Sequence, residues 1–242
     1  MSDDRSDAVL FNDTFTNHYD PDIGMAALDV LRASGARAGL TRHHCCGRPQ
    51  ISKGLLAEAR ALAARNADAL HPHAAAGRKI VFCEPSCLSA VREDAPALLR
   101  GEAQRKAKAV AAACVLFEEF VAGRDLPLRQ GPPEILLHGH CHQKAMGLLP
   151  AAASLLAKIP GSSVVVLDAG CCGMAGSFGY AHEHYEISCA IGERKLLPAV
   201  RSKRPEAVVV AAGTSCRHQV KDLTGEDAWH PAVLLRSLLT IK

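Results

Sequence analysis

A pair of adjacent cysteines followed by glycine occurs twice in this chain, at 45–47 and again at 171–173. About forty residues after each pair comes a second phrase, Glu-Pro-Ser-Cys at 84–87 and Gly-Thr-Ser-Cys at 213–216. Two adjacent cysteines rarely reach the geometry of a structural disulfide. Because the pair occurs twice, each time with a later cysteine, it indicates thiolate ligands on two related metal or cluster sites. It also indicates that one fold occurs twice in the chain.

The sequence around these phrases aligns as a repeat. Each half begins with a short apolar strand that runs into a polar tip, followed by a helix, a second strand, the Cys-Cys-Gly turn, a long amphipathic helix and a further strand. Strands are predicted at 8–11, 79–82, 135–137, 164–167 and 208–211, and helices at 23–34, 55–70, 143–159 and 183–200. Apolar, β-branched strands that alternate with helices are typical of a parallel sheet with helices on its faces.

The expected fold is therefore α/β, with two tandem, pseudo-symmetric repeats, each a small parallel sheet flanked by helices. The segment 123–133, which contains Gly-Pro-Pro, is typical of a linker. We expect a first cysteine-rich domain over residues 1–130 and a second over residues 131–242.

The cysteine phrases each follow a predicted strand directly. Ligands of parallel sheets bind beyond the carboxyl ends of the strands, so the cysteines of each half are expected to meet at one edge of its sheet. The second half is expected to gather four thiols, from Cys141, Cys171, Cys172 and Cys216. The first half is expected to gather Cys45, Cys46 and Cys87, with Thr14 and Glu84 beside them.

The second half has more candidate metal ligands than the first. Four thiolates are the number that an iron–sulfur cluster usually takes. Gly173 and Gly176 lack side chains and would let backbone N–H groups approach a cluster closely. His138, His140 and His142 would surround the ligands and tune their properties. Tetrahedral zinc is equally satisfied by four cysteines, or by three with a histidine, so spacing alone leaves both metals open. Packing as small buried apolar residues is the third interpretation.

The first half offers fewer ligands. Thr14 stands where the second half has Cys141, and only three cysteines of the repeat remain. Glu84, with His43 or His44, could complete a site. A cluster, a zinc ion and no metal at all stay open for this half. Cys114 lies in an Ala-rich stretch that is expected to be helical, and Cys189 lies in the predicted helix at 183–200. Both are expected to pack in the core.

Composition limits the partners and the compartment. Ten cysteines in a chain with an acidic start and no signal peptide favour metal binding or redox work in a reducing cytoplasm. The net charge of +3 without a basic run does not point to nucleic acid. The longest apolar run, at 109–117, is too short to span a membrane. The expectation is a cytoplasmic protein that partners could hold against the inner face of the membrane.

These motifs resemble a known family. A strand-end cysteine, a Cys-Cys-Gly turn and a later cysteine are the pattern of the cysteine-rich CCG domain. That domain occurs twice in one subunit of heterodisulfide reductase, and also in the iron–sulfur subunits of glycolate oxidase and anaerobic glycerol-3-phosphate dehydrogenase. The phrases at 12–15, 45–49, 84–87, 138–144 and 169–179 most resemble the C-terminal regions of FAD-linked oxidases that act on D-2-hydroxy acids such as D-lactate or D-2-hydroxyglutarate.

The resemblance implies a noncubane [4Fe-4S] cluster held by five cysteines in each repeat. This chain departs from that pattern at Glu84, Gly213 and Thr14. The second half keeps four of the five cysteines, which still suffices for a [4Fe-4S] cluster, whereas the first half keeps three.

The resemblance also implies a function. The chain would be an electron-transfer module of a flavin-dependent 2-hydroxyacid dehydrogenase or oxidase, a component of an oxidoreductase rather than a complete enzyme by itself. FAD would lie on a partner or on a missing domain, because no stretch resembles an FAD-binding domain, and no ferredoxin-type Cys-x-x-Cys-x-x-Cys run is present. Electrons would pass from the flavin through a ferredoxin-type iron–sulfur module towards a quinone-type acceptor. Two alternatives remain: a zinc-binding structural or docking module, and thiol–disulfide catalysis at Cys171 and Cys172.

Overall fold

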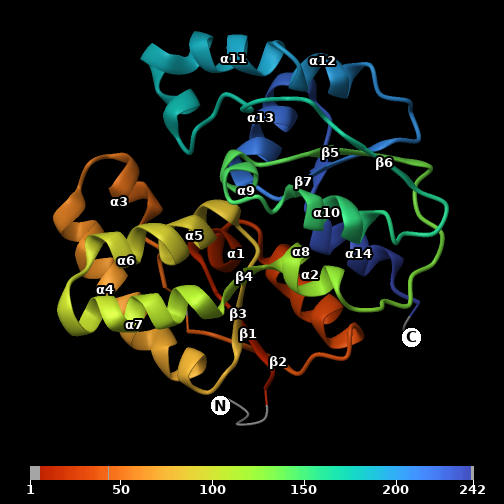
Figure 1. Ribbon diagram of the computed structural model, residues 1–242. Coiled ribbons are helices and arrows are strands. Elements are labelled where there is room, and N and C mark those ends of the chain that lie inside the picture. Colours follow the sequence, from red (N-terminus) through yellow and green to blue (C-terminus); the bar gives the residue numbers. More distant parts are fainter. Residues whose placement is uncertain (1–5, 43, 241–242) are drawn as a thin grey trace. The chain divides into compact units, whose positions relative to one another are not determined.

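The chain forms two compact units that divide between Leu126 and Pro127 (Figure 1). The structure, a computed structural model, describes residues 6–42 and 44–240. Within these residues, each unit contains one four-stranded parallel sheet flanked by helices, which confirms the α/β fold of tandem repeats. Residues 127–131 belong to the second unit, where Leu128 forms a β-bridge with Leu239.

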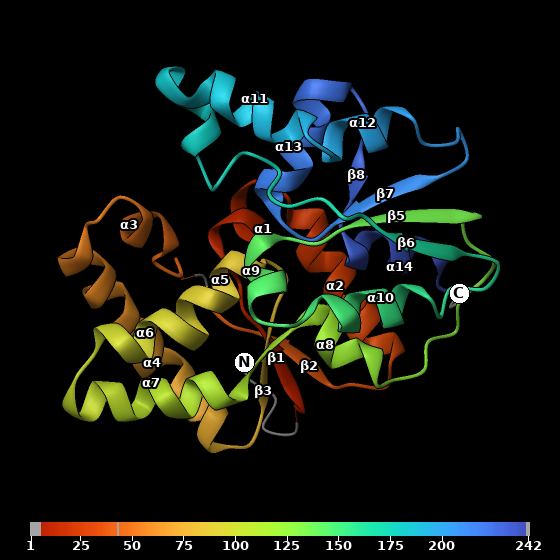
Figure 2. The same cartoon turned by 45° about the horizontal axis from the view of Figure 1, so that its top comes forward.

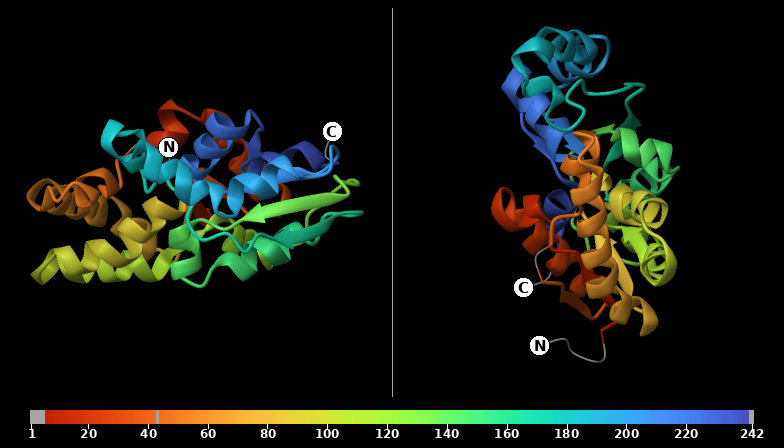
Figure 3. Two further views of the ribbon diagram at one scale, coloured as in Figure 1. Left: turned by 90° about the horizontal axis from the view of Figure 1, so that it is seen from above. Right: turned by 90° about the vertical axis from the view of Figure 1, so that its left-hand side faces the viewer.

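The sheet of the first unit has the strand order β2-β1-β3-β4. Its strands are β1 (Ala8–Leu10), β2 (Ala38–Leu40), β3 (Lys79–Phe82) and β4 (Cys114–Leu116). One face is covered by α4 (Leu56–Ala75) and α7 (Gly101–Ala113), and the other by α2 (Pro21–Ala33) and α8 (Phe117–Ala122) (Figure 1). Figure 3 shows α4, in orange, running alongside α7, in yellow-green. Shorter segments connect them: α1 (Thr14–His18), α3 (Arg48–Ser52), α5 (Pro85–Ser89), a π-helical turn (Ala90–Asp94) and α6 (Ala95–Leu98).

The sheet of the second unit repeats this topology in the order β6-β5-β7-β8. Its strands are β5 (Glu134–His138), β6 (Ser163–Val166), β7 (Val208–Ala211) and β8 (Ala228–Trp229). Figure 2 shows α12 (Leu196–Arg201) and α13 (Thr214–Thr224) on one face, and α10 (Leu149–Leu156) and α14 (Pro231–Leu238) on the other. The remaining elements are α9 (Cys141–Ala145), α11 (Tyr185–Glu193) and the 3₁₀ turns Phe178–Tyr180 and His182–His184.

The central strands are apolar on both faces because helices cover both. Val9, Ile80 and Val81 are at most 2% exposed in the first unit, and Ile135 and Val209 are fully buried in the second. Continuous apolar strands of this kind are what a parallel sheet requires. Burial of these residues anchors the strands whose carboxyl ends carry the cysteines.

Two predicted helices are each divided in the structure. The segment 143–159 forms α9 and α10 instead of one helix, because Gly147 adopts a left-handed φ of 71° and ends the first of them. The segment 183–200 forms α11 and α12, and the break falls before Pro198, whose ring cannot be accommodated inside a continuous helix. Cys114 is also misplaced by the prediction, since it ends α7 and begins β4, although it is buried as expected.

Candidate iron–sulfur site

The thiols of the second unit lie at the point where the strand order of its sheet reverses. β5 pairs with β6 on one side and with β7 on the other. Chain crossovers therefore leave in opposite directions from β5, and ligands of doubly wound sheets bind at this switch point. α9 begins at Cys141 just after β5, the Cys-Cys-Gly turn follows β6, and α13 begins at Thr214 just after β7. The fold thus brings residues from three distant segments to one edge.

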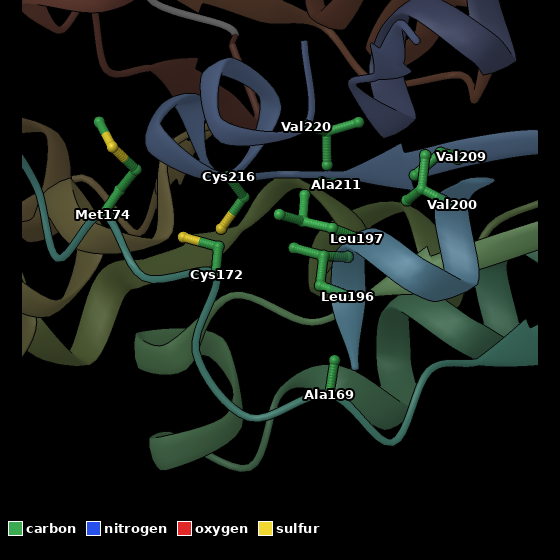
Figure 4. Packing of buried hydrophobic residues seen from close by; sticks show 10 residues of the cluster. All are labelled: Ala169, Cys172, Met174, Leu196, Leu197, Val200, Val209, Ala211, Cys216 and Val220. Carbon is green, nitrogen blue, oxygen red and sulfur yellow. The ribbon is translucent and has the colours of Figure 1, made fainter. Parts of the chain in front are cut away.

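The four predicted cysteines of this unit form a continuous row of sulfur atoms. Cys141 hydrogen-bonds to Cys171, Cys171 to Cys172, and Cys172 to Cys216. Figure 4 shows the sulfur atoms of Cys172 and Cys216 side by side, next to apolar side chains of β7, α12 and α13. Cys172 and Cys216 are buried, whereas Cys141 is exposed. The row therefore leads from the surface of the unit into its core.

The hydrogen bonds divide these thiols into donors and acceptors. Hydrogen bonds from Cys141 and Cys172 hold the pKa of Cys171 well below its ordinary value. The pKa of Cys216 is lowered as well, first by the hydrogen bond from Cys172 and then by His138. The pKa values of Cys141 and Cys172 are raised, because each donates to a neighbouring sulfur and is desolvated. Without a cation, only part of this row can be thiolate at one time.

Backbone N–H groups and glycines shape the turn around Cys171. The N–H of Gly173 donates to Cys171 Sγ at 3.3 Å, and the N–H of Ala175 lowers the pKa of the same thiol. Gly173 has a φ of 105°, and a Cβ there would lie 2.2 Å from the carbonyl oxygen of Ser188. Gly176 has a φ of 74° but open space around it. Gly173 is thus required for close packing against α11 as well as for the turn.

The three histidines named from the sequence have different surroundings. His138 is 1% exposed and hydrogen-bonds to Cys216. His140 caps α9, with its Nδ1 accepting from the N–H of His142 at 3.2 Å. The ring of His142 stacks on that of His140, with centroids 5.5 Å apart.

Two residues outside the predicted set of ligands and surrounding residues also hold this site. Gln219 of α13 donates through Nε2 to the carbonyl and hydroxyl oxygens of Ser188, at 3.2 and 3.1 Å. This bond fixes α11 against the turn that carries Cys171. Lys144 donates from Nζ to the carbonyl oxygens of Ala169, at 2.6 Å, and Gly170. Its place beside a cysteine phrase marks Lys144 in the sequence, whereas no signal there marks Gln219.

The first unit brings together three thiols at the matching edge. Cys45 hydrogen-bonds to Cys46, and Cys46 to Cys87. Thr14, which replaces the leading cysteine, hydrogen-bonds to Cys45. The carbonyl of Cys45 accepts from Asn66 Nδ2 at 2.9 Å. A cavity of about 220 Å³ adjoins this turn, lined by His44, Cys45, Leu62, Arg65 and Asn66.

Two buried carboxyl groups lie beside these thiols. Asp13 caps α1 through Oδ1, and its Oδ2 is buried with no hydrogen-bond partner among the described residues. Burial, and then the charge of Glu84, raise the pKa of Asp13 to about 6. Asp13 was not predicted as part of the site, although its place before a helix is typical of a capping residue.

The carboxyl groups also change the thiols of the first unit. The hydrogen bond from Cys46 lowers the pKa of Cys87, but burial and the charges of Asp13 and Glu84 outweigh it and raise that pKa to about 12. The pKa of Cys45 is raised by its bond to Cys46 and by burial. The pKa of Cys46 is raised too: Cys45 donates to it and lowers its pKa, but its own bond to Cys87 and its burial outweigh this effect. All three thiols are therefore protonated near neutral pH.

The two units differ in how well they fit an iron–sulfur cluster. Such a cluster needs thiolate ligands and hydrogen-bond donors that stabilise its negative charge. The second unit has four thiols, backbone donors and His138, so its donor set fits. The first unit has three thiols beside two buried carboxyl groups, so its donor set does not fit a four-thiolate cluster. His43, named above as a helper in the first unit, lies outside the described residues.

Neither a preformed site for a single metal ion nor a disulfide is found in the described residues. Over residues 6–42 and 44–240, no group of three or more His, Cys, Asp or Glu side chains is arranged to hold a single metal ion. All ten cysteines fall in the described part of the chain, and each is a free thiol there. The same part holds no helix both long and apolar enough to cross a membrane.

Comparison with known proteins decides the family. The sequence matches the CCG cysteine-rich domain twice, over residues 13–92 and 135–221. The chain belongs to the CCG cysteine-rich domain family. The two matches fall one in each compact unit, and each contains the Cys-Cys-Gly turn and the later cysteine of its unit. The family assignment made from the motifs is thereby confirmed.

Several known proteins are similar over nearly the whole chain. One subunit of the anaerobic glycerol-3-phosphate dehydrogenase of Escherichia coli (strain K12) is 29% identical over 97% of this chain. The D-2-hydroxyglutarate dehydrogenase of the same organism is 27% identical over 96% of it. One subunit of the fumarate reductase (CoM/CoB) of Methanothermobacter marburgensis is 27% identical over 88%. The matches cover 60%, 22% and 41% of these proteins, so the chain corresponds to only part of each.

Proposed function

We propose that this chain is an iron–sulfur electron-transfer module of a flavin-dependent dehydrogenase or reductase system. The observation that carries the proposal is the row of four thiols at the switch point of the second sheet. The relatives of this chain are named as dehydrogenases, a reductase or their subunits, which supports a role in a redox reaction. The proposed ligands are Cys141, Cys171, Cys172 and Cys216.

The chain's own residues would each contribute to holding the group. A bound [4Fe-4S] cluster supplies one-electron transfer. The N–H groups of Gly173 and Ala175 would donate towards the ligand Cys171, and His138 towards the ligand Cys216. These donors would offset the negative charge of the site, because hydrogen bonds to ligating sulfur stabilise an added electron.

We propose the following partners for this module. Flavin would be carried by a partner subunit or domain, with a 2-hydroxy acid as the substrate oxidised there. Electrons would reach this module through a ferredoxin-type centre and leave towards a quinone-type acceptor. We place the module in the cytoplasm, where partners could hold it against the inner face of the membrane.

Anaerobic purification followed by optical and EPR spectroscopy tests this function. The expected result is a brown protein with broad visible absorption, which bleaches on dithionite reduction and then gives an EPR signal. Cys171→Ser should lose most of the bound iron, whereas Cys189→Ser, a change outside the thiol row, should retain it. A colourless protein that contains zinc but neither iron nor acid-labile sulfide would overturn the proposal in favour of the zinc module.

A second, separate candidate for the first unit is a single zinc ion, whose binding would require the side chains there to move, because in the described residues they are not arranged to hold one ion. Cys45, Cys46 and Cys87 with Asp13 and Glu84 supply sulfur and oxygen donors, both of which zinc accepts. A dication would also offset the charge of the buried carboxyl groups. Elemental analysis should then find about one zinc per chain, the occupancy expected of a closed structural site. Cys46→Ser should remove this zinc and Cys172→Ser should leave it bound; a zinc content unaffected by Cys46→Ser would rule the site out.

A further inference from the structure

The space at position 213 is already filled by another side chain. Gly213 caps α13 with an ordinary extended backbone, at φ −76° and ψ 132°, so its conformation does not demand glycine. A Cβ built there would nevertheless lie 2.2 Å from Cδ2 and 3.0 Å from Nε2 of His140. Carbon atoms do not approach so closely, so any larger residue requires the His140 ring to move.

One hydrogen bond holds the His140 ring in this place, and a second holds the backbone of His140. Its Nδ1 accepts from the N–H of His142 at 3.2 Å, and this bond caps α9. The backbone N–H of His140 bonds to Oε1 of Gln143, whose side chain is fully buried, at 3.3 Å. His140 itself is 4% exposed. Swinging the ring away would therefore uncap α9 and disturb buried packing.

The first unit has the opposite pair of side-chain sizes at the matching positions. Its residues at the matching positions of the repeat are Asp13, which caps α1, and Glu84, which caps α5. Glu84 turns its carboxylate back to the N–H of Ser86 at 3.2 Å and to its hydroxyl at 2.8 Å. The first unit thus combines a small helix cap with a large side chain, and the second combines a large cap with glycine. In the second unit, positions 140 and 213 share one volume.

This shared volume borders the thiol row. Position 213 lies three residues before Cys216, a spacing that puts both on the same side of a helix start. A cysteine at 213 would thus be directed towards the same sulfur atoms as Cys216. We propose that His140 is a positioning residue that fixes the ligand number of this site: its ring takes the volume of a side chain at 213 and limits the site to Cys141, Cys171, Cys172 and Cys216. The ligand-number part of this inference rests on the proposed cluster function, and the placement of His140 does not.

The placement is tested by a double-mutant cycle on the metal-free chain. Unfolding of the second unit is followed through Trp229, the single tryptophan, which lies in β8. Gly213→Ala should lower the melting temperature by about 5 °C, the effect of moderate overpacking. In a His140→Asn background, where a shorter residue can still cap α9, the same Gly213→Ala should have almost no effect. Gly170→Ala is the matched control, because a Cβ there meets nothing within 4 Å. Equal losses from Gly213→Ala in both backgrounds would overturn the inference.

The ligand number is tested after anaerobic iron and sulfide loading. In the His140→Asn, Gly213→Cys protein the added thiol should be protected from a thiol reagent, and the EPR spectrum should differ from that of His140→Asn alone. Gly213→Cys with His140 intact should melt lower than wild type and give no change in the spectrum. An added thiol that is protected even with His140 intact would overturn the ligand-number role. If the wild-type chain takes up no iron, the proposed function fails, and the unfolding cycle alone then decides the placement of His140.

Discussion

At the scale of single residues, the repeat differs most at the two helix caps next to the thiols. Asp13 and His140 occupy matching places, yet one adds a buried carboxyl group and the other an imidazole ring. All three thiols of the first row have raised pKa values, and the Asp13 charge contributes to this at Cys87. In the second row, two pKa values are lowered. The first row therefore resists ionisation, whereas the second accepts it in part.

Asp13 makes the stability of the metal-free chain depend on pH. Its pKa is raised by burial from 3.8 to about 6, so the folded state binds the proton more tightly than the unfolded state. The folded state is favoured below pH 4, and this advantage is lost as the pH rises through about 6. The loss amounts to about 3 kcal/mol, because each unit of pKa corresponds to about 1.4 kcal/mol.

Asp13→Asn should remove that loss, since asparagine also caps helices but does not ionise. Above pH 6 the variant should be more stable than wild type, and below pH 4 the two should be alike. Amide hydrogen exchange in β1 and α1, measured across this range, reports the difference. If Asp13→Asn were less stable than wild type at pH 7, interactions of the ionised Asp13 carboxylate would outweigh the cost of burying its charge, and the prediction would be wrong.

Two glycines of the second Cys-Cys-Gly turn allow the cost of a left-handed backbone to be measured apart from the cost of a steric clash. Gly173→Ala adds both a left-handed residue and a contact with the carbonyl of Ser188, whereas Gly176→Ala adds only the left-handed residue. We expect Gly176→Ala to cost about 1 kcal/mol and Gly173→Ala about 3 kcal/mol or more. Urea unfolding monitored at Trp229 gives both values. Equal costs would mean that α11 can move away from the turn.

At the scale of elements, the alternation of strands and helices could be predicted, because the buried strands of a parallel sheet appear in the sequence as short runs of apolar residues. The runs around Ile80, Val165 and Val209 all became strands. β2 was expected before the first Cys-Cys-Gly turn but without bounds, because Ala38–Leu40 is short and weakly apolar. β4 and β8 were not predicted, because Cys114–Leu116 continues an Ala-rich helical stretch and Ala228–Trp229 is only two residues long. The divided helices were missed because helical periodicity continues across Gly147 and across the break before Pro198.

The candidate site was predictable to the same degree. Strand ends located the cysteines, since a parallel sheet collects its carboxyl ends on one edge. The residues that hold them in place were not predictable, because Gln219 and Asn66 act through the three-dimensional neighbourhood of α13 and α4. The close contact between the His140 ring and the backbone of Gly213 could not be predicted either, because the two residues are far apart in the sequence.

Helix α4 holds the first Cys-Cys-Gly turn through one bond. Asn66 is 2% exposed and donates to the carbonyl of Cys45 at 2.9 Å. Asn66→Ala leaves that carbonyl without its donor, at a cost of about 1–3 kcal/mol. In the metal-free chain, Cys45 should then react with a thiol reagent roughly ten times faster, in line with about 1.4 kcal/mol of easier opening. Arg65→Ala, which alters the same cavity without removing this bond, should leave the rate unchanged; a similar acceleration there would assign the effect to access instead.

At the scale of the whole molecule, the chain contains one topology twice, with strand orders β2-β1-β3-β4 and β6-β5-β7-β8. Equal folds would suggest equal sites, but the donor sets differ. The first unit offers three protonated thiols with two buried carboxyl groups, and the second offers four thiols with donors around them. The two units therefore form an unequal pair, and we propose that only the second unit carries an iron–sulfur cluster.

Iron and acid-labile sulfide counts on two matched variants test that claim most directly. Cys172→Ser and Cys46→Ser change the same position of the Cys-Cys-Gly turn, one in each unit. The full chain, purified anaerobically, should contain about four iron and four sulfide, the content of one [4Fe-4S] cluster. Cys46→Ser should retain this content, and Cys172→Ser should lose nearly all of it. Retention by Cys172→Ser, or loss of half of a doubled content in Cys46→Ser, would contradict the account.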